Sequence, residues 1–236
     1  MYQYVTKAEY KPYRQEAEEI IRRAQNIMKT KYDTTFQFKL IGSASRHLVT
    51  KIKNGNRGYD FDYNLILQKA NITNPKRLKE QFMCVFSEVV ERTPYSTPED
   101  STSSITIKVV DQDGSRILRS IDLAIIYYPD EDADEGYMYV KNWKNGRYSF
   151  EYRKLSQNIE WKLNEILEYS DGWARVREEY LKLKNKNAKI GSNKKSFILY
   201  LESVHNVYNQ IQQDEREEVE EGYNTLRLST LRLFQR

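Results

Sequence analysis

The sequence has 236 residues, of which 39% are hydrophobic and 31% charged, and its 38 basic and 34 acidic side chains give a net charge of +4. This composition is typical of a globular protein, and the small positive surplus permits binding to polyanions without requiring it. No apolar run approaches a membrane span, no signal peptide is recognisable, and Cys84 is the only cysteine. We therefore exclude membrane-spanning helices and an internal disulfide, and we expect a cytoplasmic protein with Cys84 in its core.

The first half of the chain mixes helical and strand-like patterns. Apolar side chains recur every three or four residues where we expect helices, and they alternate with polar ones where we expect strands. Turn-forming residues, above all the segment KNGNRG, separate these elements. The elements predicted in chain order are a helix over 14–30, a strand over 36–40, a helix that starts at Ser43, a strand over 59–67 and a helix over 74–93.

Two hairpins are predicted next. The β-rich run 105–128 is divided by an Asp-Gly dipeptide, and the run 137–152 turns at an Asn-Gly dipeptide. Both dipeptides favour the tight turns that join antiparallel strands. The acidic segment 129–136 between the hairpins lacks recognisable metal-ligand spacing, so we interpret it as a solvated loop.

The character of the sequence changes near residue 153. From there to the C-terminus the apolar spacing is helical almost throughout. We therefore predict an α+β protein with two domains. Residues 1–153 would form a core with a mixed sheet and an N-terminal helix, and residues 154–236 would form a helical lobe.

Three aspartates in strand-like runs are the candidate catalytic residues. Because side chains alternate along a strand, Asp60 and Asp62 project from the same face. Adjacent carboxylates repel one another unless a cation lies between them, and such hard oxygen ligands suit Mg²⁺ or Mn²⁺. Asp122 lies in the apolar run RSIDLAII, where an unpaired carboxylate would be costly. If the two strands are neighbours, the three carboxylates converge on a two-metal site.

Gly42 and Ser43 add a candidate phosphate-binding turn. A glycine after a strand lets a phosphate approach the backbone, and the first turn of a following helix presents free N–H groups. The Ser43 hydroxyl would donate to the same oxygens. A strand, a Gly-Ser turn, an Asp-x-Asp strand and a later Asp strand together predict a site that grips a nucleoside triphosphate and its metal ions.

In order and spacing, these motifs resemble those of the nucleotidyltransferase superfamily that shares the DNA polymerase beta-type core. The resemblance covers roughly half of the chain. It implies that Asp60 and Asp62 bind both metal ions, that Asp122 helps to activate the acceptor hydroxyl, and that Gly42 and Ser43 hold the β- and γ-phosphates. The trailing helices are similar in placement to the superfamily's C-terminal helical lobe, which closes the cleft over base and acceptor.

Three further residues are candidates for nucleotide binding. Arg46 follows the Gly-Ser turn and would pair with a phosphate oxygen, although a surface position on a helix explains it equally well. Lys195 and Ser196 stand at a predicted helix start. The resemblance implies a role for them in binding the triphosphate, since lysine and serine residues of the helical lobe do so in related enzymes; a lysine-rich first turn is the alternative. Many superfamily members carry a second Gly-Ser or Gly-Thr pair a few residues after the first. The segment GSASRHLVTKIKNGNRGYDFD has no such second pair, so no subfamily is assigned.

The predicted function is metal-dependent transfer of a nucleoside monophosphate from an NTP to an acceptor hydroxyl, with release of pyrophosphate. The mildly basic composition favours RNA or a nucleotide as the acceptor. The alternatives are adenylylation of a small molecule or protein, a non-catalytic nucleotide- or RNA-binding module of the same fold, and an interaction protein that docks through its C-terminal helix. No motif defines the base preference or the oligomeric state.

Overall fold

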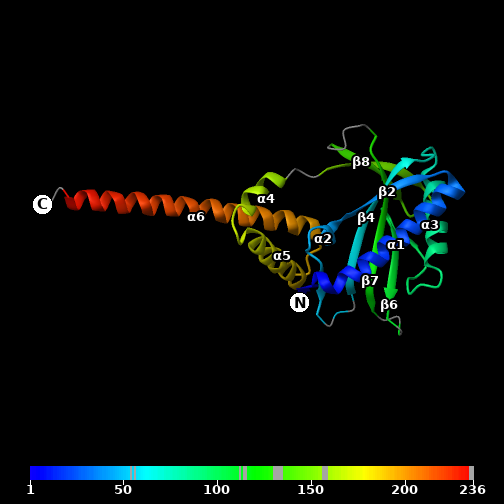
Figure 1. Ribbon diagram of the computed structural model, residues 1–236, viewed down its shortest axis with the longest axis horizontal. Coiled ribbons are helices and arrows are strands. Elements are labelled where there is room, and N and C mark those ends of the chain that lie inside the picture. The colour runs from blue at the N-terminus through cyan, green and yellow to red at the C-terminus, as the bar shows by residue number, and fades with distance from the viewer. Residues whose placement is uncertain are drawn as a thin grey trace. The chain divides into compact units, whose positions relative to one another are not determined.

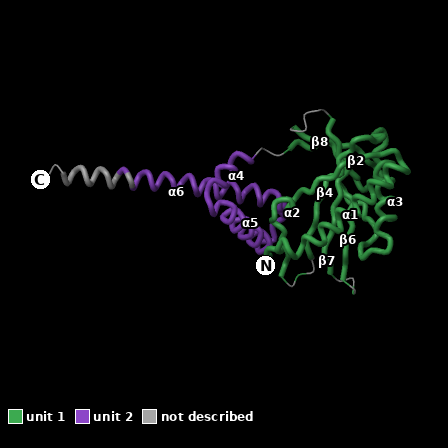
Figure 2. The backbone as a smooth tube through the Cα atoms, in the orientation of Figure 1, with its two compact units in different colours: residues 1–156 green, residues 157–236 purple. Residues whose placement is uncertain are grey.

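The computed structural model describes residues 1–53, 55, 57–111, 113, 116–129, 135–155 and 159–233, except for the side chains of 57, 222 and 224–233. The chain divides into two compact units, residues 1–156 and 157–236 (Figure 2). Parts of three predicted loops lie outside the described residues: the KNGNRG segment, the Asp-Gly turn and the acidic segment. The side chains at the end of the C-terminal helix also lie outside them.

A seven-stranded mixed sheet forms the centre of the first unit (Figure 1). Its order is β2-β4-β7-β6-β5, with β8 paired to β7 and β9 to β8. β4 and β7 run parallel, and the other pairs are antiparallel. β1 and β3 form a separate two-stranded sheet. The strands are β1 (Tyr2–Tyr4), β2 (Thr35–Ile41), β3 (Thr50–Ile52), β4 (Arg57–Lys69), β5 (Glu99–Asp100), β6 (Ile105–Val110), β7 (Ile117–Tyr127), β8 (Gly136–Asn142) and β9 (Tyr148–Lys154).

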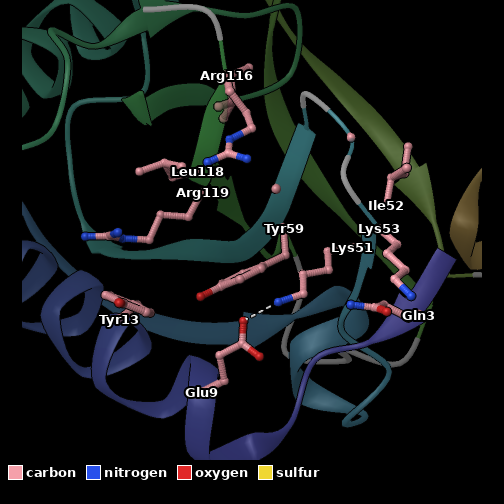
Figure 3. Close-up of a pocket in the computed structure, with 13 residues that line it drawn as sticks. Gln3, Glu9, Tyr13, Lys51, Ile52, Lys53, Tyr59, Arg116, Leu118 and Arg119 are labelled. Carbon is pink, nitrogen blue, oxygen red and sulfur yellow. Dashed lines mark hydrogen bonds and ion pairs between the residues drawn. The ribbon is translucent and has the colours of Figure 1, made fainter. Parts of the chain in front are cut away.

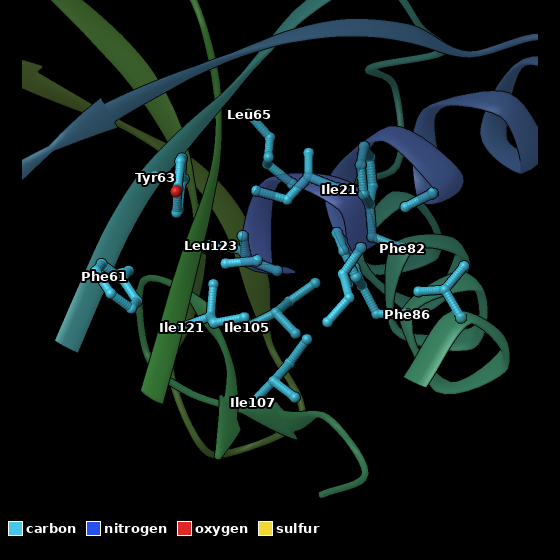
Figure 4. Close-up of a cluster of buried hydrophobic side chains, with 14 of the residues drawn as sticks. Ile21, Phe61, Tyr63, Leu65, Phe82, Phe86, Ile105, Ile107, Ile121 and Leu123 are labelled. Atoms are coloured by element: carbon cyan, nitrogen blue, oxygen red, sulfur yellow. The ribbon is translucent and has the colours of Figure 1, made fainter. Parts of the chain in front are cut away.

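One face of this sheet is apolar and packs against α1 (Lys7–Tyr32) and α3 (Pro75–Val90). Along β4, the side chains of Phe61, Tyr63 and Leu65 are buried in the same cluster as apolar residues of α1 and α3 (Figure 4). Burying each such side chain stabilises the fold by about 1.5–3 kcal/mol. The alternation therefore fixes which side chains of β4 lie on the opposite face.

Side-chain caps fix where the two helices of this core begin. Thr6 Oγ1 accepts a hydrogen bond from Glu9 N at 3.2 Å at the start of α1, and Asn74 Oδ1 accepts one from Arg77 N at 2.9 Å at the start of α3. The start of α3 is as predicted. The prediction for α1 began at residue 14, seven residues late, because the turns before it carry little apolar periodicity.

Both predicted hairpins are present, since β6 pairs with β7 and β8 with β9 in antiparallel register. The helix predicted from Ser43 is wrong in length. α2 (Gly42–Ser45) has only four residues, and His47 follows with φ +56°, which ends the helical path. Thr50 then begins β3, because this segment pairs with β1 instead of continuing as a helix.

Cys84 is exposed, contrary to the prediction of a core position. The buried positions of this part of α3 are Phe82, Val85, Phe86 and Val89, which form a stripe at helical spacing. Cys84 falls outside that stripe. An apolar run within a helix thus does not bury each of its members.

The described part of the second unit contains helices and no strands. They are α4 (Glu160–Leu167), α5 (Gly172–Lys189) and α6 (Ser196–Leu233). α6 has 38 residues and lies in the part of the chain where the sequence predicted helical spacing almost throughout. In the described part of the chain, no helix is long and apolar enough to cross a bilayer.

Candidate active site

Three aspartates lie on one face of the sheet, on its two parallel strands. Asp60 and Asp62 alternate along β4 with the buried rings of the core, so their side chains occupy the opposite face. The parallel register places Asp62 beside Asp122 of β7. Neighbouring strands lie about 4.8 Å apart. The predicted adjacency of the two strands is thereby confirmed, and it brings the second and third aspartates together.

The turn after β2 presses against Asp62. Ile41, the last residue of β2, pairs with Asp62, and the chain then turns at Gly42. Gly42 has a φ of +68°, and a Cβ atom at this position would lie 2.2 Å from Asp62 Oδ2. Only glycine adopts this backbone conformation readily and leaves that space free. The predicted phosphate-binding turn and the predicted metal-binding carboxylate are therefore in direct contact.

Two side chains brace this turn. The Arg46 guanidinium donates to the Gly42 carbonyl at 3.0 Å, and the Ser45 hydroxyl donates to the same oxygen at 2.9 Å. Arg46 therefore holds the backbone of the turn, and its contact with a phosphate stays a prediction. Within the described ranges, no hydrogen bond to the Ser43 hydroxyl is present. This hydroxyl is available to a ligand.

Two hydroxyl groups that the sequence analysis missed hold the outer carboxylates. The Ser120 hydroxyl donates to Asp60 Oδ1, and the Thr106 hydroxyl donates to Asp122 Oδ1 at 2.5 Å. Each hydroxyl is the cross-strand partner of its carboxylate in the sheet register. A signal was available for Ser120, because it precedes Asp122 by two residues and so shares its face. Thr106 had no comparable signal before the strand order was known.

Asp62 lies in an environment that disfavours its charged form. Burial, followed by the charges of Asp122 and Asp60, raises the pKa of Asp62 to about 7. A divalent cation would offset both causes. Hard oxygen donors, like charges side by side and a turn kept open by glycine all fit Mg²⁺ or Mn²⁺.

The carboxylates are nevertheless not gathered around a single point. Considering only the described residues, no group of three or more His, Cys, Asp or Glu side chains is arranged to hold a metal ion. In the structure, Asp60 and Asp122 instead accept hydrogen bonds from Ser120 and Thr106.

Asn64 extends the same face of β4 beyond Asp62. Its side chain is 7% exposed, and its Oδ1 has no hydrogen-bond partner in the described structure. Buried amides are almost always paired, so an open acceptor beside a candidate site points to a contact made by a ligand. Asn64 was not among the predicted site residues, although the alternation DFDYN places it on the aspartate face.

Lys195 and Ser196 lie in the second unit. Ser196 begins α6, and the Lys195 carbonyl accepts a hydrogen bond from Leu199 N at 3.2 Å. They therefore stand at a helix start, as the sequence predicted. Their contact with a triphosphate stays a prediction.

Comparison with known proteins defines the fold class of this chain. No family model matches the sequence, and no curated protein matches it. Solved structures do match, and they share an α+β nucleotidyltransferase fold with a mixed sheet and a C-terminal helical part. The predicted fold class is confirmed.

Among the solved structures that match are several of DncV, the cyclic AMP-GMP synthase of Vibrio cholerae. Its complex with the linear intermediate 5' pppA(3',5')pG matches with a TM-score of 0.62 and 11% identity, over 86% of this chain and 68% of that chain. Its complex with GTP and 5MTHFGLU2 gives 0.61 and 11%, over 86% and 69%. Its GTP-bound form gives 0.52 and 14%, over 81% and 50%. At such identities the likeness shows the fold alone.

Proposed function

We propose that this protein is a metal-dependent nucleotidyltransferase that moves a nucleoside monophosphate from an NTP to the hydroxyl of a nucleotide acceptor and releases pyrophosphate. One observation carries the proposal. Asp62 lies beside Asp122 on parallel strands, under a glycine turn that has no room for a side chain. A turn that accommodates phosphates directly against paired carboxylates is the arrangement that triphosphate transfer needs.

The residues divide the chemistry between them. Asp60 and Asp62 would hold Mg²⁺ or Mn²⁺, and Asp122 would complete the set; when bound, such ions stabilise charge on the attacking and leaving oxygens. The Ser43 hydroxyl donates to the phosphates. Asp122 orients the acceptor hydroxyl and favours loss of its proton. The hydroxyl oxygen then bonds to the α-phosphorus as the bond to the bridging oxygen breaks, and pyrophosphate leaves.

A nucleotide is the acceptor that the comparisons favour. The matched DncV structure holds a linear intermediate in which two nucleotides are joined 3',5'. An acceptor of that kind is itself an NTP, so the same donor pool would supply both substrates. RNA, the other acceptor predicted from the sequence, presents the same ribose hydroxyl and is the natural comparison in the assay.

The test uses each of the four α-labelled NTPs with Mg²⁺ or Mn²⁺. Each is offered alone, with a second unlabelled NTP, and with an oligoribonucleotide. The parent protein should form a labelled product and release pyrophosphate in step. Asp60→Ala/Asp62→Ala should lower the rate by several orders of magnitude, because it removes metal ligands. Glu80→Ala/Glu88→Ala removes two exposed carboxylates of α3 and serves as the charge-matched control.

The outcomes separate the alternatives. Transfer to the oligoribonucleotide alone would replace the nucleotide acceptor by RNA. Binding of NTP without transfer and without pyrophosphate release would overturn the enzymatic proposal and favour a non-catalytic binding module. Equal turnover by the parent and the double aspartate variant would remove these carboxylates from the mechanism.

A further inference from the structure

The hairpin formed by β8 and β9 carries a concentrated positive charge. Residues 136–154 contain five basic side chains and one acidic side chain, Glu151. The rest of the chain holds equal numbers of basic and acidic residues, so the whole surplus of +4 lies in this hairpin. The basic residues are Lys141, Lys144, Arg147, Arg153 and Lys154. A local surplus of this kind attracts polyanions.

The cations of the hairpin differ from those of another basic surface, the cleft at the starts of β4 and β7 (Figure 3). In that cleft, Lys51 and Arg119 lie 2.6 and 3.1 Å from carboxylate oxygens of α1. In the part of the chain that the structure describes, no ion pair joins Lys141, Arg147 or Arg153 to a carboxylate. Their charges are therefore open to an anionic ligand.

Trp143 adds an aromatic surface to these cations. Its indole N–H donates to the Ser149 hydroxyl at 2.8 Å, and the Lys141 ammonium lies 3.2 Å from the ring centre. The Arg147 guanidinium lies 5.5 Å from the same centre. These contacts hold the ring in place, yet the residue is 40% exposed. A ring that is both fixed and partly open offers a stacking surface at little further cost in conformational entropy.

A second pair of an aromatic ring and a cation lies on the same face of the hairpin. The Arg153 guanidinium is 4.3 Å from the centre of the Tyr139 ring. Tyr139 and Lys141 are two residues apart on β8, so they share a face. Trp143 contacts both Lys141 and its cross-strand partner Ser149, which places the indole on that face too. Rings and cations thus alternate along one side of the hairpin.

This side of the hairpin continues the face of the sheet that carries the aspartates. Tyr139 pairs with Ile126 of β7, and directly paired residues point to the same face. Ile126 follows Asp122 by four residues and therefore shares its face. Four residues of a strand span about 13 Å. A long ligand on the hairpin would therefore lie on the same side of the sheet as the proposed active site.

We propose that this face of the β8–β9 hairpin binds single-stranded nucleic acid. The phosphates would contact Lys141, Arg147 and Arg153, and unpaired bases would stack on Trp143 and Tyr139. Aromatic rings stack on bases of any identity, while basic side chains follow the phosphates. A polyanion without free bases would match the charges and leave the rings unused. The inference goes beyond the proposed transfer reaction and does not depend on it.

The experiment measures binding of the full chain to labelled oligouridylate and oligothymidylate of about 12 nucleotides by fluorescence anisotropy, in EDTA and without NTP. We expect saturable binding of both, with a Kd between about 1 and 100 µM at physiological salt. Three phosphate contacts predict that the logarithm of the binding constant falls with the logarithm of salt concentration with a slope of about −2. A duplex of the same length should bind at least about 5-fold more weakly, because its bases are paired.

Variants separate charge from stacking. Lys141→Gln/Arg147→Gln should weaken binding about 10-fold and make the salt slope shallower by about 1.4, since two phosphate contacts are lost. Trp143→Ala should weaken binding at least about 5-fold without changing the slope, and Trp143→Phe should retain most of the affinity. Arg23→Gln/Lys29→Gln makes the same change in net charge at exposed positions of α1 and should bind like the parent.

The proposal is overturned if the parent binds neither oligonucleotide, or if the two double variants lose affinity equally. It is also overturned if Trp143→Ala binds like the parent or if the duplex binds as tightly as the single strand, because the surface would then recognise charge alone. The assay contains neither metal nor NTP. Binding without transfer would therefore contradict only the proposed reaction, and transfer without binding would contradict only this inference.

Discussion

At Gly42, both the backbone conformation and the geometry of the candidate site require a glycine. Its φ is +68°, and a Cβ atom there would meet the far end of the Asp62 side chain. An alanine would therefore cost stability through the backbone and would also push the carboxylate out of place. Gly146 provides a matched control, since its φ is +80° and no atom lies within 4 Å of the position that a Cβ atom would take there.

We expect Gly146→Ala to lower stability by about 1 kcal/mol because it places a side chain at positive φ, and Gly42→Ala to lower it by at least as much, because it must also displace the Asp62 side chain. Only Gly42→Ala should lower the rate of nucleotidyl transfer strongly, by about 100-fold or more, because it displaces a carboxylate of the proposed site. Thermal unfolding and the labelled-NTP assay measure the two effects. Full activity of folded Gly42→Ala would show that the turn does not serve the carboxylates.

Ser120 is expected to position a carboxylate without touching the substrate. Its hydroxyl donates to Asp60, so Ser120→Ala frees that side chain to rotate. Loss of such a partner commonly weakens metal binding by about 10- to 100-fold. The half-saturating Mg²⁺ concentration for transfer should rise accordingly, while the rate at saturating Mg²⁺ changes less. Ser104→Ala is the comparison, because Ser104 makes only a 3.4 Å contact with Asp122; equal Mg²⁺ curves for the parent and Ser120→Ala would rule the role out.

The site residues differ in how visible they are to sequence reasoning. Asp60, Asp62 and Asp122 stand out because a carboxylate in an apolar strand is costly and needs a reason. Ser120 and Thr106 are ordinary strand residues, and only the strand register shows that each contacts a carboxylate. Local alternation fixes which face a side chain takes, but the identity of its neighbour depends on which strands pair.

At the scale of elements, the periodicity of the sequence correctly predicted those helices and strands whose conformation is determined within a single segment. The hairpins and α3 were found because turn residues and an apolar stripe define them within one segment. The segment after Gly42 was wrongly predicted as a longer helix. Its conformation depends on the pairing of β3 with β1, and β1 is distant in sequence because it precedes α1. The predicted α2 was too long for the same reason.

A buried ion pair joins α3 to the strands beside it. Lys79 Nζ lies 2.6 Å from Asp100 Oδ1 and donates to the Ser101 carbonyl at 2.6 Å, although the Lys79 side chain is only 2% exposed. Tyr148 donates to the other Asp100 oxygen at 2.5 Å. Burial lowers the pKa of Lys79, and its hydrogen bond to Asp100 offsets this only in part.

Lys79→Met should destabilise the protein by about 2–3 kcal/mol, because it leaves Asp100 without its cation. Lys79→Met/Asp100→Asn should recover much of that loss, since no unpaired charge then remains. Lys76→Met, at an exposed position of the same helix, should change stability by less than about 0.5 kcal/mol. Chemical denaturation of the four proteins tests this. A double variant no more stable than Lys79→Met would show that the two residues do not act as a pair.

At the scale of the whole molecule, the order of the structural elements along the chain predicts the fold better than sequence identity does. The chain shares its fold with DncV at 11% identity, and the order of strand, glycine turn, Asp-x-Asp strand and third Asp strand was enough to predict it. Substitution is restricted where the backbone or a carboxylate leaves no space for a side chain, as at Gly42.

The free energy of unfolding of the whole protein should depend on pH through the ionisation of Asp62. Its pKa lies near 3.8 when the chain is unfolded and about 7 in the fold, so between these values the folded state binds the proton more tightly. Raising the pH from 4 to 7 therefore removes stability from the metal-free protein, on the order of 3 kcal/mol from this group. Carboxylates with lowered pKa values act in the opposite direction, so a comparison of two proteins is needed to isolate it.

Asp62→Asn supplies that comparison. We expect it to match the parent near pH 4 and to be more stable than the parent by several degrees in Tm at pH 7.5, while transferring no nucleotide. Adding Mg²⁺ at pH 7.5 should raise the Tm of the parent and leave that of the variant nearly unchanged, because the cation relieves the repulsion that the substitution has already removed. A Tm difference that is the same at both pH values would mean that the site is not strained by its charges, and the electrostatic argument for a cation between these strands would fail.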